Sequence, residues 1–78
     1  MNNNLEKYEE LKELLELDMN LISMIYTRPY SDDVFIEIKN HEYIGTIAKT
    51  LQYYTTKYKI EYDTGVYTLT INLDDMNF

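Results

Sequence analysis

The sequence predicts an α+β domain of chain order α-β-β-α-β-β, with two helices packed on one face of a four-stranded antiparallel sheet. Three observations lead to this prediction. Two segments carry apolar residues at helical spacing, two pairs of segments alternate apolar with polar residues, and turn-forming residues separate the segments of each pair. A chain of 78 residues is the size of one domain, so we expect residues 1–78 to form a single small acidic domain.

The first helix is predicted near the N-terminus and extends to about residue 17. Its core side is formed by apolar residues at helical spacing: Leu5, Tyr8, Leu11, Leu14 and Leu15. Asn3 can cap this helix, because Glu6 follows three residues later in the capping-box position. The exposed side carries five glutamates: Glu6, Glu9, Glu10, Glu13 and Glu16. The polar residues at 18–20 should end the helix.

The first hairpin is predicted to follow this helix. Residues 20–27 fit either a continued helix or a strand, but β-branched and aromatic residues and the turn at 28–33 favour a strand. Residues 34–39 alternate cleanly, as a strand with one buried face does. The core face of this second strand should carry Val34, Ile36 and Ile38.

A second helix and a second hairpin complete the predicted fold. Asn40 can cap the helix, whose buried side consists of Ile44, Ile47, Ala48 and Leu51. Residues 58–62 and 66–73 alternate on either side of Asp63-Thr64-Gly65. We interpret this tripeptide as a three-residue loop, in which a type I turn is followed by a left-handed glycine bulge.

Asp-Thr-Gly is also the tripeptide that surrounds the catalytic aspartate of aspartic proteases. Such a site needs two carboxylates that share a proton, supplied by two such loops. The retroviral-type enzymes, which dimerise to supply them, are glycine-rich and all-β, whereas this chain has two glycines and two predicted helices. The hairpin accounts for the tripeptide, so we assign Asp63 a structural role.

Other catalytic sites are poorly supported. Glu37-Ile38-Lys39, with Asp32 and Asp33 upstream, resembles the carboxylate–lysine sites of metal-dependent nucleases, but an acidic chain repels a nucleic-acid substrate. The chain has no cysteine and one histidine, His41, too few for a zinc site or a nucleophilic triad. We therefore expect a protein that is not an enzyme and has no catalytic residues, metal or cofactor, with a small nuclease or aspartic protease as a remote alternative.

The charge of the chain points to a protein partner. Fourteen acidic residues face seven basic ones, and the net charge of −7 argues against direct nucleic-acid binding. Such a charge also serves solubility, but it suits a partner with a basic surface. Glutamates three and four residues apart on a helix lie about 5–6 Å apart at Cβ, which is comparable to the spacing of phosphates along a nucleic-acid strand.

We therefore expect a non-enzymatic inhibitor or modulator that mimics nucleic acid and binds a nucleic-acid-handling enzyme, as the anti-restriction and anti-CRISPR proteins of phages do. The predicted partner-binding residues combine the helix glutamates with the 28–33 turn and nearby tyrosines: Glu6, Glu9, Glu10, Glu13, Glu16, Asp32, Asp33, Tyr26 and Tyr30.

The alternative is a structural or regulatory module that self-associates. Nine tyrosines are too many for so small a core, and exposed tyrosine is enriched at binding hot spots. Self-association through sheet edges or the tyrosine surface would give a homodimer. The uncharged start of the chain and the lack of an apolar run of about 20 residues predict no signal peptide and no membrane span. We expect a cytoplasmic protein, located in the host cytoplasm if its gene is viral.

Overall fold

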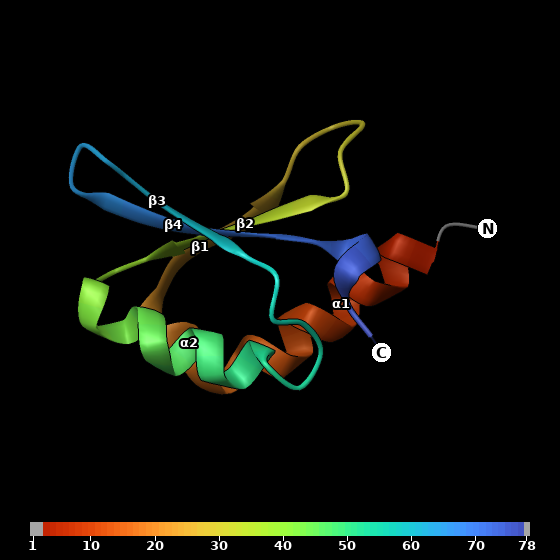
Figure 1. Ribbon diagram of the computed structural model, residues 1–78, viewed down its shortest axis with the longest axis horizontal. Coiled ribbons are helices and arrows are strands. Elements are labelled where there is room, and N and C mark those ends of the chain that lie inside the picture. The colour runs from red at the N-terminus through yellow and green to blue at the C-terminus, as the bar shows by residue number, and fades with distance from the viewer. Residues whose placement is uncertain (1–2, 78) are drawn as a thin grey trace.

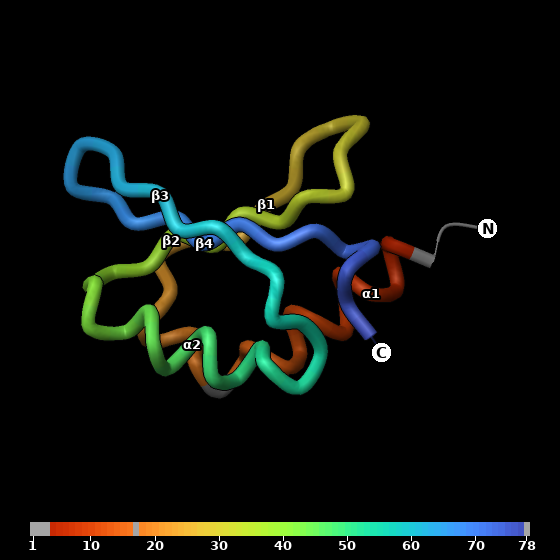
Figure 2. Tube along the Cα trace, viewed as in Figure 1, coloured from red at the N-terminus to blue at the C-terminus, as the bar shows by residue number. Residues whose placement is uncertain are grey.

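The computed structural model describes residues 3–77, apart from the side chains of Asn3 and Leu17. Within these residues, two α-helices lie on one side of a four-stranded antiparallel sheet whose strand order is β1-β2-β4-β3 (Figure 1). The tips of both hairpins point away from the helices (Figures 1 and 2). The predicted α+β fold and its chain order are confirmed. The predicted cap by Asn3 involves a side chain outside the described part.

The first helix is shorter than predicted. Helix α1 spans Asn3–Leu14, and the chain then tightens into a 3-10 helix at Leu15–Leu21, so the prediction of α-helix to residue 17 is wrong. The segment contains no glycine or proline, and two hydrogen bonds to distant residues hold it in place. Asp18 accepts a hydrogen bond from Thr50 Oγ1 at 2.8 Å, and the Leu21 carbonyl accepts one from the Lys39 N–H at 3.1 Å. A 3-10 helix rises more steeply per residue, which suits a short connection to the sheet.

The first hairpin consists of β1 (Ile22–Thr27) and β2 (Asp33–Ile38). The strand interpretation of the ambiguous segment is therefore correct from residue 22 onward. The β1–β2 register shifts between Ile22 and Met24, which marks a β-bulge in β1. The alternation of β2 is as predicted, since Val34, Ile36 and Ile38 are buried.

Helix α2 (Ile44–Leu51) follows a short 3-10 turn at His41–Tyr43. The predicted cap is confirmed, because Asn40 Oδ1 accepts a hydrogen bond from the Glu42 N–H at 3.1 Å. Ile47 and Leu51 are fully buried, as their spacing predicted.

The second hairpin consists of β3 (Lys59–Asp63) and β4 (Val66–Asn72), and its turn differs from the prediction. Asp63 pairs directly with Val66, which leaves a two-residue loop. Both loop residues have positive φ, 51° at Thr64 and 82° at Gly65, as in a type I′ turn. The interpretation as a three-residue loop is therefore wrong. A type I′ turn follows the right-handed twist of the two strands, and this preference prevails over the reluctance of a β-branched residue to adopt positive φ.

The core lies between the sheet and the helices and includes residues from both ends of the chain. Leu11 and Leu15 of the first helical segment pack there with the buried residues of β2 and β4. After β4, a 3-10 turn at Leu73–Asp75 contacts α1, and Met76 is buried behind it. Leu5, by contrast, is 60% exposed although its spacing predicted burial, because it lies over a shallow hollow by the β1–β2 loop.

Candidate protein-binding surfaces

What we call the acidic face of α1 comprises four glutamates of that helix and one of the 3-10 helix that continues it, and all five side chains are exposed: Glu6, Glu9, Glu10, Glu13 and Glu16. Nearby lysines neutralise little of this charge. Lys12 Nζ lies 3.4 Å from Glu9 Oε1 and 4.7 Å from the centre of the Tyr8 ring. Lys7 turns toward the C-terminal segment, where its Nζ donates to the Leu73 carbonyl at 3.1 Å. Within the described residues, the other four glutamates form no ion pair.

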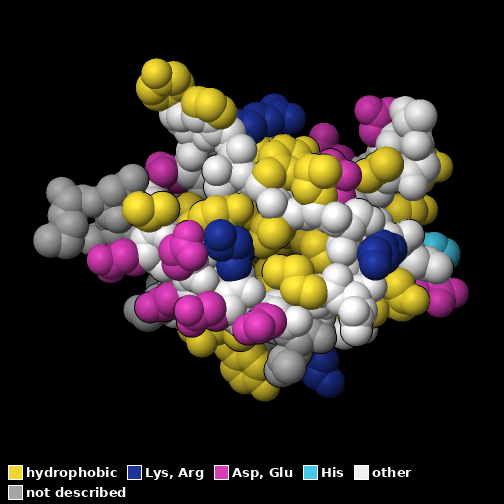
Figure 3. Space-filling view, turned by 180° about the vertical axis from the view of Figure 1, so that it is seen from behind, with side chains coloured by type: hydrophobic (Ala, Val, Ile, Leu, Met, Phe, Trp, Pro, Cys, Tyr) yellow, Lys and Arg dark blue, Asp and Glu magenta, His cyan; other side chains and the backbone are white. Residues whose placement is uncertain are grey.

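The C-terminal turn brings further carboxylates to the start of α1. Asn4 Nδ2 donates to Asp74 Oδ1 at 3.1 Å across 70 residues of sequence. Asp75 is also exposed, with Lys57 Nζ at 3.9 Å from its Oδ1. In the space-filling view, acidic side chains gather beside the N-terminal end of the chain, with a basic side chain next to them (Figure 3). Sequence reasoning missed the contribution of Asp74, because only the fold shows that the two ends of the chain lie together.

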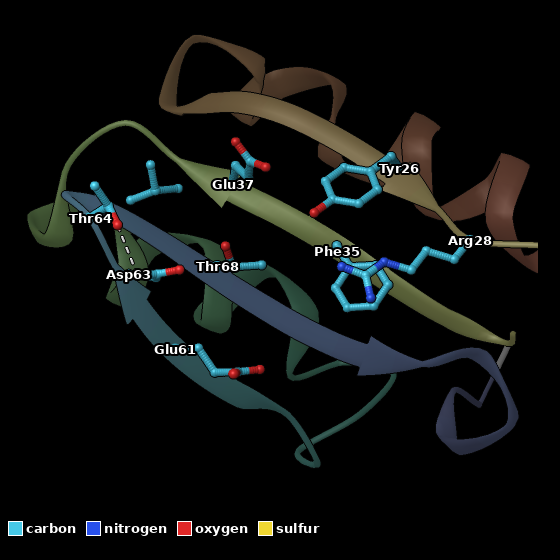
Figure 4. Close-up of a pocket in the computed structure, with 9 residues that line it drawn as sticks. Tyr26, Arg28, Phe35, Glu37, Glu61, Asp63, Thr64 and Thr68 are labelled. Carbon is cyan, nitrogen blue, oxygen red and sulfur yellow. Dashed lines mark hydrogen bonds between the residues drawn. The ribbon is translucent and has the colours of Figure 1, made fainter.

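The open face of the sheet, which the helices do not cover, holds a second candidate surface. Tyr26 stacks on Phe35 with ring centroids 5.2 Å apart, and the Arg28 guanidinium lies 4.6 Å from the Phe35 ring (Figure 4). These residues line one side of a hollow of about 360 Å³, whose other walls include Glu61 and Asp63 from β3. The hollow combines aromatic rings with carboxylates. Across residues 3–77, however, we find no group of three or more His, Cys, Asp or Glu that could hold a metal ion.

The two predicted aspartates, Asp32 and Asp33, lie where the β1–β2 loop meets β2, and their surroundings differ. Asp33 faces the open side of the sheet, where its Oδ1 accepts a hydrogen bond from Asn72 Nδ2 at 3.0 Å. The Asp32 side chain is exposed, and its carbonyl accepts the Leu73 N–H at 2.8 Å. Tyr30 projects fully into solvent from a left-handed backbone with φ of 62°.

The predicted binding residues therefore fall into two groups on different sides of the molecule. The glutamates of α1 lie on the helical side, together with Asp32, which shares a small hollow with Leu5 and Tyr8. Tyr26 and Asp33 lie on the open side of the sheet. The first group and Tyr26 therefore lie on different faces of the molecule.

Asp63 stands at the tip of the second hairpin, next to the turn. Its Oδ1 accepts a hydrogen bond from Thr64 Oγ1 at 2.9 Å (Figure 4). This contact holds the side chain against its own loop. His41 lies at the start of the second helical segment, where its ring is 5.9 Å from that of Tyr67.

Comparison of the chain with models of protein families, with curated proteins and with solved structures finds no match. In the described part of the chain, neither α-helix is long and apolar enough to cross a membrane.

Proposed function

We propose that this chain is a non-enzymatic inhibitor or modulator that binds a protein, and that the acidic face of α1 contacts a basic, nucleic-acid-binding surface of an enzyme. The observation that carries the proposal is the set of exposed glutamates without an ion-pair partner among the described residues, three on α1 and one, Glu16, on the 3-10 helix that follows it. The protein would act in the cytoplasm, where enzymes that handle nucleic acids work.

The energetics of the helix support a role for these charges beyond solubility. Glu6 and Glu10, and Glu9 and Glu13, are four residues apart on α1. Like charges at this spacing destabilise a helix by about 0.2–0.5 kcal/mol per pair. A soluble domain can place its charges without this cost. A basic partner would relieve the repulsion, so part of the cost would return as binding energy.

The helix is also held rigidly enough to present the charges as an array. Leu11 and Leu15 on its inner side are fully buried in the core. The C-terminal turn anchors its first turns through Lys7 and Asn4. A preorganised array avoids the ordering cost that flexible charges meet on binding.

The test is a capture experiment with two matched variants. Glu13→Lys with Glu16→Lys, here called the α1 variant, reverses two charges of the acidic face, at the end of α1 and at the start of the 3-10 helix after it, and moves the net charge from −7 to −3. Glu37→Lys with Glu42→Lys, here called the β2/α2 variant, changes the net charge equally but lies on β2 and on the 3-10 turn before α2. Each immobilised protein is incubated with a bacterial lysate, and retained proteins are identified by mass spectrometry.

We expect the wild type and the β2/α2 variant to retain the same nucleic-acid-binding proteins. Double-stranded DNA and raised salt should release them, because the contacts imitate phosphates and are screened over about 8 Å at physiological ionic strength. The amount of these proteins that the α1 variant retains should fall roughly tenfold or more, since each reversed charge weakens both the contact and the electrostatic steering of the partner. Equal retention by the α1 variant and the wild type would overturn the proposal.

A further inference from the structure

Strand β3 is an open edge of the sheet with apolar side chains beside it. In the strand order β1-β2-β4-β3 it pairs with β4 on one side only, and all five of its residues are exposed. On the helix-facing side, Tyr58, Ile60 and Tyr62 are 42%, 41% and 62% exposed. A groove of about 380 Å³ lies between α2 and Tyr58. An edge with free backbone groups and adjacent apolar side chains is able to pair with another strand.

The turn geometry shows which backbone groups of β3 are free. In a two-residue hairpin, the residues that flank the loop form a hydrogen-bonded pair, here Asp63 and Val66. Such pairs alternate along an antiparallel ladder. Asp63, Glu61 and Lys59 therefore direct their N–H and C=O groups to β4. Ile60 and Tyr62 direct theirs outward, away from the sheet.

The other edge of the sheet is less suited to pairing. Strand β1 contains the bulge between Ile22 and Met24, and bulges twist an edge away from a regular ladder. The β3–β4 register is unbroken from Lys59 to Asp63. Of the two edges, β3 is the one that offers a straight ladder.

The sequence of β3 is complementary to itself in one antiparallel register. When two copies pair about a two-fold axis at Ile60, Lys59 of each copy lies opposite Glu61 of the other. In the same register, Tyr58 lies opposite Tyr62, and Lys57, just before the strand, lies opposite Asp63. Each opposed pair shares one face of the sheet, so opposite charges meet on the open face and aromatic rings meet on the helix-facing side.

The neighbouring register is unfavourable. An axis at Glu61 places Glu61 opposite its own copy, and like charges directly opposite each other destabilise a ladder. In addition, the backbone groups of Ile60 point outward, so the two copies of Ile60 that face each other across the axis form a hydrogen-bonded pair. Two more such pairs, each between Tyr58 of one copy and Tyr62 of the other, flank it. Charge, aromatic pairing and backbone phase all select the axis at Ile60.

We propose that a second copy of this chain is the occupant of the β3 edge. The two sheets then form one eight-stranded antiparallel sheet about a two-fold axis at Ile60, with Lys59–Glu61 ion pairs between the copies. In the single chain, Lys59, Glu61 and Asp63 form no ion pair within the described residues. The dimer supplies partners for Lys59 and Glu61, and it brings Lys57 of the other copy, which lies 3.9 Å from Asp75 in the single chain, opposite Asp63. None of these residues belongs to the acidic face of α1, so this proposal and the proposed function fail separately.

The first test is a charge swap followed by sedimentation across a concentration series from micromolar to millimolar. Lys59→Glu and Glu61→Lys should each weaken dimerisation roughly tenfold or more, because each places like charges opposite one another twice per dimer. The double variant Lys59→Glu with Glu61→Lys restores the opposite charges and should regain most of the wild-type affinity. Lys39→Glu and Glu42→Lys, which make the same charge changes away from β3, should dimerise nearly as the wild type does.

The second test reads the register directly by cross-linking, because the chain has no cysteine of its own. In a hydrogen-bonded pair the Cα atoms are about 5.5 Å apart, within the range that a disulfide spans. Ile60→Cys should therefore cross-link under mild oxidation, and Glu61→Cys should not. A wild type that stays monomeric to millimolar concentration, or a double variant that is not rescued, would overturn the dimer. The reverse cross-linking pattern would overturn the register.

Discussion

Thr64 shows a conflict between a residue and its place in the fold. It has a φ of 51°, a conformation that β-branched residues rarely adopt, and its hydroxyl donates to Asp63 Oδ1. Strain of this kind costs on the order of 1–3 kcal/mol, part of which the hydrogen bond offsets. Asn-Gly is the sequence that a type I′ turn prefers.

Thr64→Asn should therefore stabilise the protein by about 1 kcal/mol, which raises the Tm by roughly 4–8 °C in a domain of this size. Thermal unfolding followed by circular dichroism measures the change. Asp63→Asn is the matched control, since the amide oxygen can accept the same hydrogen bond from Thr64, and its Tm should stay close to that of the wild type. A Thr64→Asn variant less stable than the wild type would show that the hydroxyl contact outweighs the strain.

The conflict at Thr64 also explains why the turn type was not predictable from the residues alone. Asp63-Thr64-Gly65 contains one residue that accepts positive φ freely, Gly65, and this composition favours a three-residue loop with a single left-handed position. The pairing of Asp63 with Val66 leaves a two-residue turn in which both residues must have positive φ. Here the twist and the register of the whole hairpin decide the conformation of one residue.

At the scale of elements, the segment after β4 holds the helices and the sheet together. Met76 is 2% exposed, its N–H donates to the Leu73 carbonyl, and the Asn77 N–H donates to the Tyr54 carbonyl. A short turn thus contacts α1 on one side and the segment after α2 on the other.

Met76→Ala should destabilise the protein by about 2–3 kcal/mol, because a buried methionine is replaced by a partly filled cavity. Asn77→Ala, at an exposed neighbour that keeps its backbone hydrogen bond, should change the free energy of unfolding by less than about 0.5 kcal/mol. Urea unfolding measures both changes in the free energy of unfolding, provided that the m-value is the same for each variant as for the wild type. Equal effects of the two substitutions would mean that Met76 contributes little to the core.

The elements that the sequence predicted well are those defined by local patterns. The alternation of β2, the cap of α2 by Asn40 and the pairing of the second hairpin are all present in the structure. The 3-10 helix at Leu15–Leu21 was not predictable from local patterns, since the contacts that hold it, to Thr50 and Lys39, come from residues far away in the sequence.

At the scale of the whole molecule, charge repulsion should limit stability at low salt. With a net charge of −7 and few ion pairs in the described part, raising NaCl from about 10 mM to 500 mM shortens the Debye length from about 30 Å to less than 10 Å. The Tm should rise by a few degrees, roughly 2–6 °C, as self-repulsion is screened.

The two charge-reversal variants show where this repulsion arises. Glu13→Lys with Glu16→Lys should raise the Tm at low salt and flatten its salt dependence, because close like charges of the acidic face are removed. Glu37→Lys with Glu42→Lys gives the same net charge and should have the smaller effect. Equal responses would show that net charge matters and that the crowding of charges on α1 does not.

The candidate surfaces were predictable in part. The glutamates of α1 could be placed on one exposed face because helical periodicity is local. Their separation from Tyr26 and Asp33, and the addition of Asp74 from the other end of the chain, depend on which elements become neighbours in space. The free edge of β3 likewise follows from the strand order.

The strand order also bears on how the chain folds. Each hairpin joins strands that are close in sequence, but the central seam joins β2 to β4, where Asp33 and Asn72 are 39 residues apart. Local pairs close quickly, whereas distant pairs must first overcome the entropy of a long loop. We therefore expect the docking of the two helix–hairpin halves along β2 and β4 to limit the folding rate. Until the halves dock, the apolar side of each half is exposed to solvent. In a concentrated solution of refolding chains, halves from different molecules can then pair with each other.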